Sequence, residues 1–314
     1  MNSVAIIIPA FNEAPNIVNS LMEILRHTQS IAAVKFVLIV VDDGSGDKTA
    51  DLILEEGQST SDNIKLLCLT RHFGKEAAIY AGLVQAAQFD ATIVMDSDLQ
   101  HPPELIAEMI AYWQQGYLIV EGVKSSRGDE ELAKSFLARP YYRLFNFFTK
   151  LSISGDTDFK LLDKTVVNAY CALPEHNRFF RGLVKWMNFP TRQIHFDVPE
   201  SLKRRSSWGN SALLRYAVSS ITSFTAFPLQ IVTLLGGITF LISIVIGGVA
   251  LLDKLSGKAI DGFTTVILLI LLIGSILMFS IGLIGIYVGK IYDEVKRRPS
   301  YLVNQNKSNL EDLL

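Results

Sequence analysis

Cysteine is scarce in this sequence: 314 residues contain only two, Cys68 and Cys171. They lie far apart in the chain, and Cys68 stands in an apolar run. A small secreted fold held by disulfides is therefore excluded, and buried free thiols in a reducing compartment are expected. Residues 1–10 lack a basic flank and run straight into polar residues, which argues against a cleavable signal peptide.

Other absences limit the function. The pattern G-x-G-x-x-G does not follow the first apolar run, and G-x-x-x-x-G-K-[ST] occurs nowhere, which argues against a dinucleotide-dependent oxidoreductase and a P-loop nucleotidase. The formal net charge of −2 argues neither for nor against a nucleic-acid partner, but no basic surface interleaved with aromatic residues favours one, so none is expected. Four histidines lack metal-ligand spacing and are interpreted as structural: His72, His101, His176 and His195.

Charge is missing from two long stretches near the C-terminus, residues 228–252 and 263–289. Each is longer than the roughly 20 residues that cross about 30 Å of hydrocarbon. Basic residues precede the first stretch and follow the second, whereas residues 253–262 form a short polar loop of balanced charge. By the positive-inside rule, the sequence predicts a hairpin of two transmembrane helices with both flanks in the cytoplasm. A buried hairpin in a soluble core is the alternative.

Short apolar runs alternate with helical patterns in the first half of the chain. Strands are predicted at residues 3–9, 36–41, 64–69, 91–95 and 117–123. Helices are predicted at residues 17–25 and around residues 77–87. A further helix is predicted to start at His101, with Pro102 and Glu104 in its first turn. The alternation predicts an α/β fold with a mostly parallel, Rossmann-like sheet covered on both faces.

Composition divides the chain into four parts. Residues 1–205 are predicted as the catalytic α/β domain, 206–227 as an interfacial amphipathic helix, 228–289 as the transmembrane pair and 290–314 as a cytoplasmic tail. Residues 132–150 mix basic and aromatic side chains, so they form either another interfacial helix or an ordinary core-facing helix. Glycines in both apolar stretches let helices approach closely, which favours a homo-oligomer.

Pairs of carboxylates stand at the ends of two predicted strands. Asp42 and Asp43 follow the second strand, and Asp96 and Asp98 follow the fourth. Ligands of parallel sheets bind outside the carboxyl ends of the strands. Carboxylates two residues apart suit Mg²⁺ or Mn²⁺, which keep several waters and bridge substrate phosphates. Helix capping by residues 42–47, and a solvated turn at the second pair, are the alternatives.

A metal held by carboxylates, without a phosphate-binding loop, fits a nucleotide-sugar enzyme, in which the cation neutralises the leaving diphosphate. The surrounding motifs resemble those of family 2 (GT-A fold) inverting glycosyltransferases, of the branch that loads a sugar onto a polyprenyl phosphate. Within that branch the best match is to bactoprenol (undecaprenyl) phosphate glucosyltransferases, and dolichol-phosphate mannose synthase is a more distant relative. The matching motifs are IPAFNE (8–13), VDDGS (41–45), RHFGKE (71–76), MDSDLQHPPE (95–104), DFKL (158–161) and NRFFRG (177–182).

The resemblance implies roles on the donor side. It places Asp96 and Asp98 at the metal. Lys75 would lie beside the diphosphate and Gln100 near the sugar. The full set implied to bind the nucleotide sugar is Pro9, Phe11, Glu13, Asp42, Asp43, Lys75, Asp96 and Gln100.

On the acceptor side, the resemblance implies that Asp158, on a loop facing the donor, is the catalytic carboxylate, with Asp156 competing for the role. Relatives often carry a basic residue just after a Gly-x-Ser, but here Gly209-Asn210-Ser211 is followed by Ala212, and Arg215 is the candidate replacement. The residues implied to clamp the acceptor phosphate are Arg127, Arg205 or its neighbour Arg204, and Arg215.

The implied reaction is hexose transfer: UDP-glucose and polyprenyl phosphate give polyprenyl-phosphate glucose and UDP, with inversion at the anomeric carbon. The implied location is the cytoplasmic face of the cell's inner (plasma) membrane, with a multi-pass chain. Enzymatic alternatives are a GDP-mannose-dependent mannosyltransferase and a transferase of an amino sugar or modified pentose. A membrane-tethered nucleotide-binding scaffold without turnover is the alternative from another class. The pattern Q-x-x-R-W of processive synthases is absent, which favours one transfer per acceptor.

Overall fold

The computed structural model describes residues 2–32, 34–60, 63–124, 156–197, 227–256 and 262–309. The chain divides into two compact units, which we describe separately. One unit comprises Met1–Ser207 together with Arg298–Leu314, and the other comprises Trp208–Arg297.

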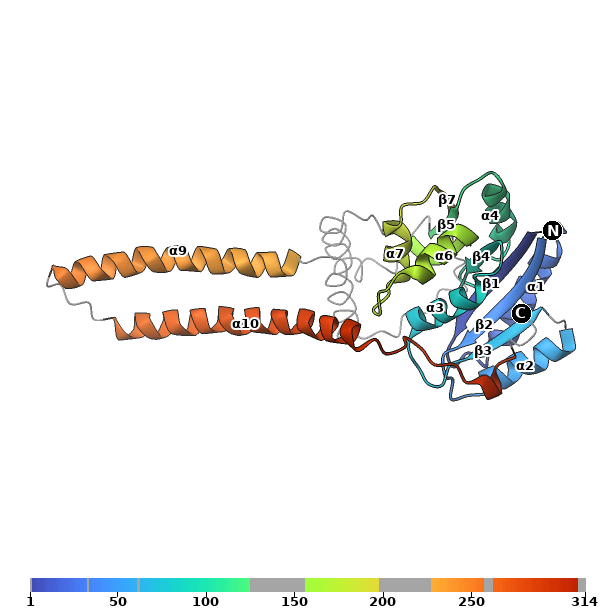
Figure 1. Cartoon of the computed structure of the whole chain (residues 1–314), viewed down its shortest axis with the longest axis horizontal. Helices are drawn as coiled ribbons and strands as arrows, with labels where there is room; N and C mark the ends of the chain where they lie inside the picture. The colour runs from blue at the N-terminus through green and yellow to red at the C-terminus, as the bar shows by residue number, and fades with distance from the viewer. Residues whose placement is uncertain are drawn as a thin grey trace. The chain divides into compact units, whose positions relative to one another are not determined.

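Among the described residues, seven strands form one sheet in the first unit, in the order β3-β2-β1-β4-β6-β5-β7 (Figure 1). Strands β1 to β4 are parallel, β6 is antiparallel to β4 and β5, and β5 is parallel to β7. The mostly parallel α/β sheet and its first five strands are thereby confirmed, whereas β6 and β7 were not predicted. The bounds are β1 (Asn2–Ala10), β2 (Val34–Asp42), β3 (Ile64–Cys68), β4 (Ala91–Val94), β5 (Ile119–Lys124), β6 (Asp156–Asp163) and β7 (Thr191–Phe196).

Helices cover both faces of this sheet because its strands are apolar on both sides. On one face, Ile6 and Ile8 of β1 pack with Ile17 and Ile24 in the main core. On the other face, α3 lies so close to β1 that a Cβ on Gly82 would stand 2.5 Å from Ile7. The first face carries α1 (Ile17–Gln29), α2 (Thr49–Thr60) and α4 (Leu105–Gln114), and the second carries α3 (Lys75–Ala86), α6 (Lys164–Ala172) and α7 (Phe180–Trp186) (Figure 1).

The start of α4 differs from the prediction. The helix begins at Leu105 rather than at His101, and the segment before it forms turns in which Leu105 N–H donates to Pro102 O at 3.2 Å. A residue that precedes a proline is disfavoured in the helical region. Because His101 precedes Pro102 and Pro102 precedes Pro103, two successive positions resist helical geometry.

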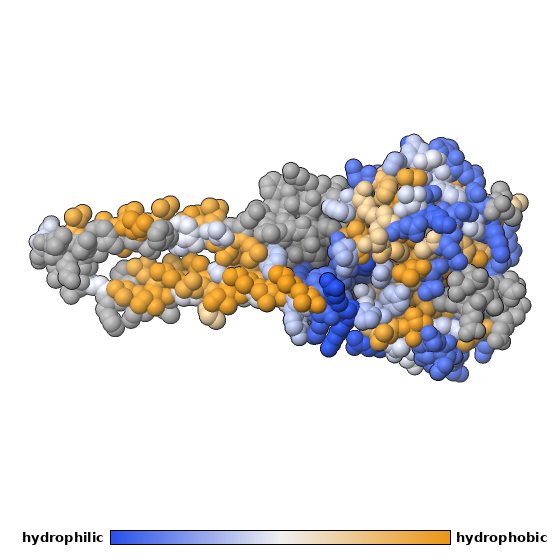
Figure 2. Space-filling model, viewed as in Figure 1, coloured by the Kyte–Doolittle hydropathy of each residue, from blue (hydrophilic) through white to orange (hydrophobic). Residues whose placement is uncertain are grey.

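The second unit contains two long helices in contact with each other, α9 (Phe227–Leu255) and α10 (Phe263–Lys296). Their described side chains are mostly hydrophobic and exposed, as Figure 2 shows in orange. Within the described residues, one segment, Leu272–Lys296, is long and apolar enough to cross a membrane, and an apolar stretch in α9, Val232–Ile246, is shorter. The described part of the chain thus has one candidate membrane helix, and the two-helix transmembrane hairpin remains a prediction.

The C-terminal segment returns to the first unit instead of forming a separate tail. Helix α10 continues past the predicted end of the second span to Lys296, and Arg297 ends it in a left-handed conformation (φ 49°). Val303 then forms an antiparallel bridge with Leu69, next to β3, and a short 3-10 helix, η3 (Gln305–Lys307), follows.

Candidate active site

The carboxyl ends of three neighbouring strands meet at one edge of the sheet. Strand β1 is parallel to both β2 and β4, so the residues after Ala10, Asp42 and Val94 lie at the same edge. Strand β6 runs antiparallel to β4, with Lys160 opposite Val94, so its first residues also lie there. Asp158 is therefore part of a strand, which corrects the predicted loop. Polar and apolar residues alternate over residues 158–161 of β6, so Asp158 and Lys160 point to one face of the sheet and Phe159 to the other.

Asp158 is held by two cations from two helices. Its side chain is only 5% exposed. Lys75 Nζ at the start of α3 lies 2.6 Å from Asp158 Oδ2, and Arg181 of α7 binds both oxygens, with Nε 2.6 Å from Oδ1 and Nη2 2.9 Å from Oδ2. Lys75 Nζ also lies 2.5 Å from Asp96 Oδ1. One lysine thus joins the implied catalytic carboxylate to the implied metal carboxylate.

These contacts fix the charge of the cluster. Burial opposes ionisation of Asp158, but Lys75 and Arg181 outweigh it and hold the pKa of this carboxyl below its usual range. Partial desolvation opposes the charge on Lys75, but Asp96 and Asp158 outweigh it and raise the lysine pKa. The pKa of Asp96 is also lowered, because the charge of Lys75 outweighs the desolvation of this carboxylate. Asp158 therefore acts as a carboxylate at neutral pH and has no proton to donate.

Asp156, the competing candidate, belongs to a different cluster. Its carboxylate pairs with the buried Lys160, whose Nζ also lies 2.7 Å from Glu121 Oε2. Burial raises the pKa of Asp156 in spite of this partner. The geometry therefore favours Asp158 as the carboxylate that faces the strand ends.

The loop after β4 carries the implied metal ligands. His101 Nδ1 accepts the N–H of Asp96 at 3.1 Å, and Asp98 Oδ1 accepts the N–H of Gln100 at 3.1 Å. Burial lowers the pKa of His101, so its ring is neutral at neutral pH. Leu99 has a φ of 57°, which is strained for a bulky residue. Among the described residues, no group of three or more His, Cys, Asp or Glu is arranged to hold a metal.

The loop after β2 carries the implied nucleotide residues. Asp43 is buried, and its carboxylate accepts the backbone N–H groups of Phe73 (2.7 Å) and Gly74 (2.8 Å). His72 Nδ1 lies 2.8 Å from Asp43 Oδ2, and the His72 ring stacks on Phe11 with centroids 4.1 Å apart. Asp43 thereby holds the loop that leads into α3 and Lys75, and two exposed rings lie beside the strand ends.

The other residues predicted to bind the nucleotide sugar lie around the same edge of the sheet. Pro9 is buried near the end of β1, and Glu13 N–H donates to Thr49 Oγ1 at 2.9 Å. Asp42 accepts Ser45 N–H at 3.3 Å, and burial raises its pKa. The capping alternative holds for Asp47, whose Oδ1 accepts Thr49 N–H at the start of α2.

Sequence reasoning missed three residues of this site. His72 was interpreted as structural but is an exposed ring in the loop that Asp43 holds. Arg181 stands in the NRFFRG motif without an assigned role, and that motif was the available indication. Glu76 Oε2 accepts Phe180 N–H at 2.8 Å, and burial together with nearby Asp158 raises the Glu76 pKa to about 7.

The acceptor side remains a prediction. Arg127, Arg204, Arg205 and Arg215 lie outside the described residues, as do residues 132–150 and nearly all of the predicted interfacial helix 206–227. Among the described residues, Gln100 Oε1 accepts a hydrogen bond from Lys124 Nζ at 3.4 Å.

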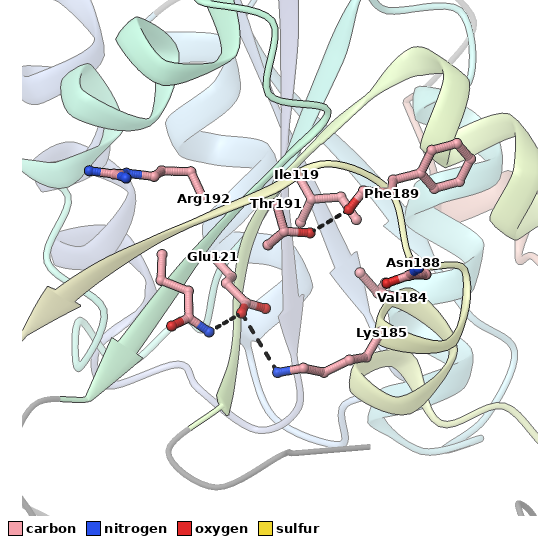
Figure 3. Close-up of a pocket in the computed structure, with 9 residues that line it drawn as sticks. Ile119, Glu121, Val184, Lys185, Asn188, Phe189, Thr191 and Arg192 are labelled. Atoms are coloured by element: carbon pink, nitrogen blue, oxygen red, sulfur yellow. Dashed lines mark hydrogen bonds and ion pairs between the residues drawn. The ribbon is translucent and has the colours of Figure 1, made fainter. Parts of the chain in front are cut away.

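A separate hollow of about 530 Å³ lies among β5, β7 and the region after α7 (Figure 3). Glu121 Oε1 accepts Gln193 Nε2 there at 2.6 Å and lies 3.7 Å from Lys185 Nζ. Of the described residues that line the hollow, none is a predicted site residue. The hollow is therefore distinct from the cluster at the strand ends.

Comparison with known proteins agrees with the fold and the motifs. The family model for glycosyl transferase family 2 matches residues 5–169. An uncharacterized glycosyltransferase of Synechocystis sp. is 36% identical, covering 96% of this chain and 94% of the relative. A prophage-derived bactoprenol glucosyl transferase of Shigella flexneri is 32% identical, covering 96% and 98%.

A solved structure shares the architecture. The crystal structure of mannosyl-3-phosphoglycerate synthase from Rubrobacter xylanophilus superposes with a TM-score of 0.52 at 18% identity, covering 71% of this chain and 73% of that one. This likeness shows a GT-A-like fold. Because the family model spans more than half of the chain and the relatives nearly all of it, the chain belongs to glycosyl transferase family 2.

Proposed function

We propose that this glycosyltransferase transfers a hexose, glucose from UDP-glucose, to undecaprenyl or another polyprenyl phosphate at the cytoplasmic face of the membrane, with inversion. The observation that carries the proposal is the link made by Lys75 between Asp96 and Asp158. The name of the 32% identical Shigella flexneri relative supports the lipid acceptor and glucose. The apolar segment Leu272–Lys296 supports a membrane location.

The reaction needs little proton chemistry from the protein. An oxygen of the acceptor phosphate, already anionic near neutral pH, attacks the anomeric carbon while the carbon–oxygen bond to the diphosphate breaks and its electron pair leaves with UDP. Asp158, held as a carboxylate by Lys75 and Arg181, orients the acceptor and offsets positive charge that develops on the sugar. Lys75 then lies where it stabilises the negative charge of the leaving diphosphate.

The carboxylates of this site are suitable ligands for a divalent cation that they would share with the substrate. Asp96 and Asp98 offer oxygen ligands two residues apart, and substrate oxygens with water would complete the shell. When bound, Mg²⁺ or Mn²⁺ supplies positive charge next to the leaving group.

The test is sugar transfer by the purified full-length chain. UDP-glucose, GDP-mannose and an amino-sugar donor are incubated separately with undecaprenyl phosphate, with Mg²⁺, Mn²⁺ or EDTA, and the lipid phase is extracted and counted. Label is expected in the lipid phase with UDP-glucose and a metal. Label only from GDP-mannose would reassign the donor, and nucleotide binding without transfer to lipid from any donor would favour a scaffold.

Asp158→Asn tests the implied catalytic residue. The amide keeps the size of the side chain but removes the charge that Lys75 and Arg181 bind, so kcat is expected to fall by about 10²-fold or more. Asp51→Asn, an exposed carboxylate in the first turn of α2, is the matched control and should leave kcat unchanged. Equal activities of the two variants would remove Asp158 from the reaction.

A further inference from the structure

The segment that follows α10 in the chain is built into the edge of the sheet. We call residues 301–309 the strap. Figure 1 shows it in red beside β3, an edge strand of the described sheet. The hydrogen bonds that join it to β3 and to the loop after β3 include Thr70 N–H to Leu302 O (2.9 Å), Asn304 N–H to Cys68 O (2.8 Å), Cys68 N–H to Ser308 Oγ (3.0 Å), Asn309 N–H to Leu66 O (3.1 Å) and Leu66 N–H to Asn309 Oδ1 (2.5 Å).

At the start of the strap, Tyr301 contacts the helix that carries Lys75. Its ring meets the ring of Tyr80 edge-on, with centroids 5.8 Å apart. Tyr80 stands on α3, five residues after Lys75. The guanidinium of Arg178 lies on the same Tyr80 ring, 3.7 Å from its centroid. Tyr301, Tyr80 and Arg178 therefore form one stack that joins the strap, α3 and the segment before α7.

Arg178 fixes the segment that presents Arg181. Its Nη1 donates to Tyr170 O at 2.9 Å and its Nη2 to Leu173 O at 2.6 Å. Two residues later, Phe180 N–H donates to Glu76 of α3. Arg181 follows directly and binds both oxygens of Asp158.

The strap also binds the loop that leads from β3 to Lys75. Thr70, which donates to Leu302, begins the loop that Asp43 grips at Phe73 and Gly74. That loop ends at Lys75, the second cation on Asp158. The segment that ends at Lys75 thus binds the strap directly at Thr70, whereas the segment that carries Arg181 reaches the strap through the Tyr80 ring.

We propose that the strap is a positioning element for the carboxylate cluster, in which Tyr301 acts through Tyr80 and Arg178 to fix Lys75 and Arg181 on Asp158. The role in turnover rests on the proposed function, whereas the mechanical link does not. Loss of the stack lets α3 and the segment before α7 move apart. A displacement of about 1 Å of a catalytic group costs up to about a hundredfold in rate.

The first test changes the ring. Tyr301→Ala removes the contact with Tyr80, and Tyr301→Phe keeps it. In the full-length chain, Tyr301→Ala is expected to lower kcat for sugar transfer about tenfold or more. The KM for the nucleotide sugar is expected to change less than kcat, because the ring pair of Phe11 and His72 lies outside the stack. Tyr301→Phe is expected to restore the wild-type kcat.

The second test removes one of the backbone hydrogen bonds that attach the strap to β3. Asn304→Pro removes the N–H that donates to Cys68 O, and Asn304→Ala keeps it, so the two variants form a matched pair. Amide hydrogen exchange of the full-length chain in detergent is expected to quicken at residues 75–80 and 178–183 in Asn304→Pro, and to stay at the wild-type rate in Asn304→Ala. Thermal unfolding of both variants checks that the fold is kept.

The outcomes separate the two proposals. If Tyr301→Ala and Asn304→Pro leave both kcat and exchange at wild-type values, the strap has no positioning role. Quicker exchange with unchanged kcat also overturns it, because the cluster would then work without the strap. If the wild-type chain transfers no sugar but exchange at residues 178–183 responds to Asn304→Pro and not to Asn304→Ala, the proposed function fails and the mechanical link stands.

Discussion

The ring of His72 stacks on Phe11 and points its Nδ1 at the buried carboxylate of Asp43. Stacking of a nucleobase on an aromatic ring is worth about 1–3 kcal/mol. We therefore expect His72→Ala to raise the KM for the nucleotide sugar several-fold and to change kcat less, as measured by initial rates. His195→Ala, an exposed histidine on β7, should have no effect. A change confined to kcat would place His72 at the reacting atoms instead.

Because of Glu76, we expect the free energy of unfolding of the chain to depend on pH. Its pKa is about 7 in the folded chain against an ordinary 4.5, because of burial and the nearby Asp158. The folded state therefore binds this proton more tightly than the unfolded state. The stabilisation is complete below the unfolded pKa and is lost as the pH rises through about 7.

Glu76→Gln tests this dependence, because the amide oxygen still accepts Phe180 N–H but does not titrate. Thermal unfolding should show the variant gaining stability relative to wild type between about pH 5 and about pH 8. A difference between the two chains that stays constant with pH would contradict the assignment.

For single residues, the sequence predicted which side chains lie near one another more successfully than it predicted their contact partners. Asp96, Asp98 and the carboxylates after β2 could be placed at one edge because strand ends in a parallel sheet share an edge. The partners of Asp158 could not, because Lys75 and Arg181 are 83 and 23 residues away from it in the chain. No local pattern encodes such a contact.

Among the elements, the turn after β2 is set by Gly44. Its φ is +71°, and a Cβ there would stand 2.4 Å from the carbonyl carbon of Arg71. Gly44→Ala should therefore displace the loop that leads to Lys75 and cost about 1–3 kcal/mol, as measured by thermal unfolding. Gly46→Ala, where a Cβ meets nothing within 4 Å, is the control and should stay within about 0.5 kcal/mol of wild type. Equal losses would show that the close approach does not matter.

The elements themselves were predictable where the apolar runs were continuous. Strands β1 to β5 are short buried runs and were found from the sequence. Strand β6 was missed because Asp156, Asp158 and Lys160 interrupt its apolar pattern, and these charges are tolerated in the core only because each has a partner. Strand β7 was missed because most of its residues are exposed.

For the molecule as a whole, the hairpin prediction places the end of α9 and the strap on opposite sides of the membrane. Ser256→Cys and Asn306→Cys put exposed thiols at these two places. In right-side-out vesicles, an impermeant maleimide should label the first variant and not the second, and inside-out vesicles should show the reverse. The wild-type chain is the control, since burial raises the pKa of Cys68 to about 12 and that of Cys171 to about 11. Labelling of both variants from the same side would rule out the hairpin.

The edge of the sheet also dictates an order of events during biosynthesis. Leu66 and Cys68 of β3 find their partners in the strap 243 and 240 residues later, after both long helices have been translated. When the ribosome has synthesised all residues of β1 to β7, it has therefore not yet synthesised the strap that hydrogen-bonds to the edge strand β3. The first unit can therefore reach its final form only after the apolar helices α9 and α10 have been synthesised and the strap that follows them has left the exit tunnel.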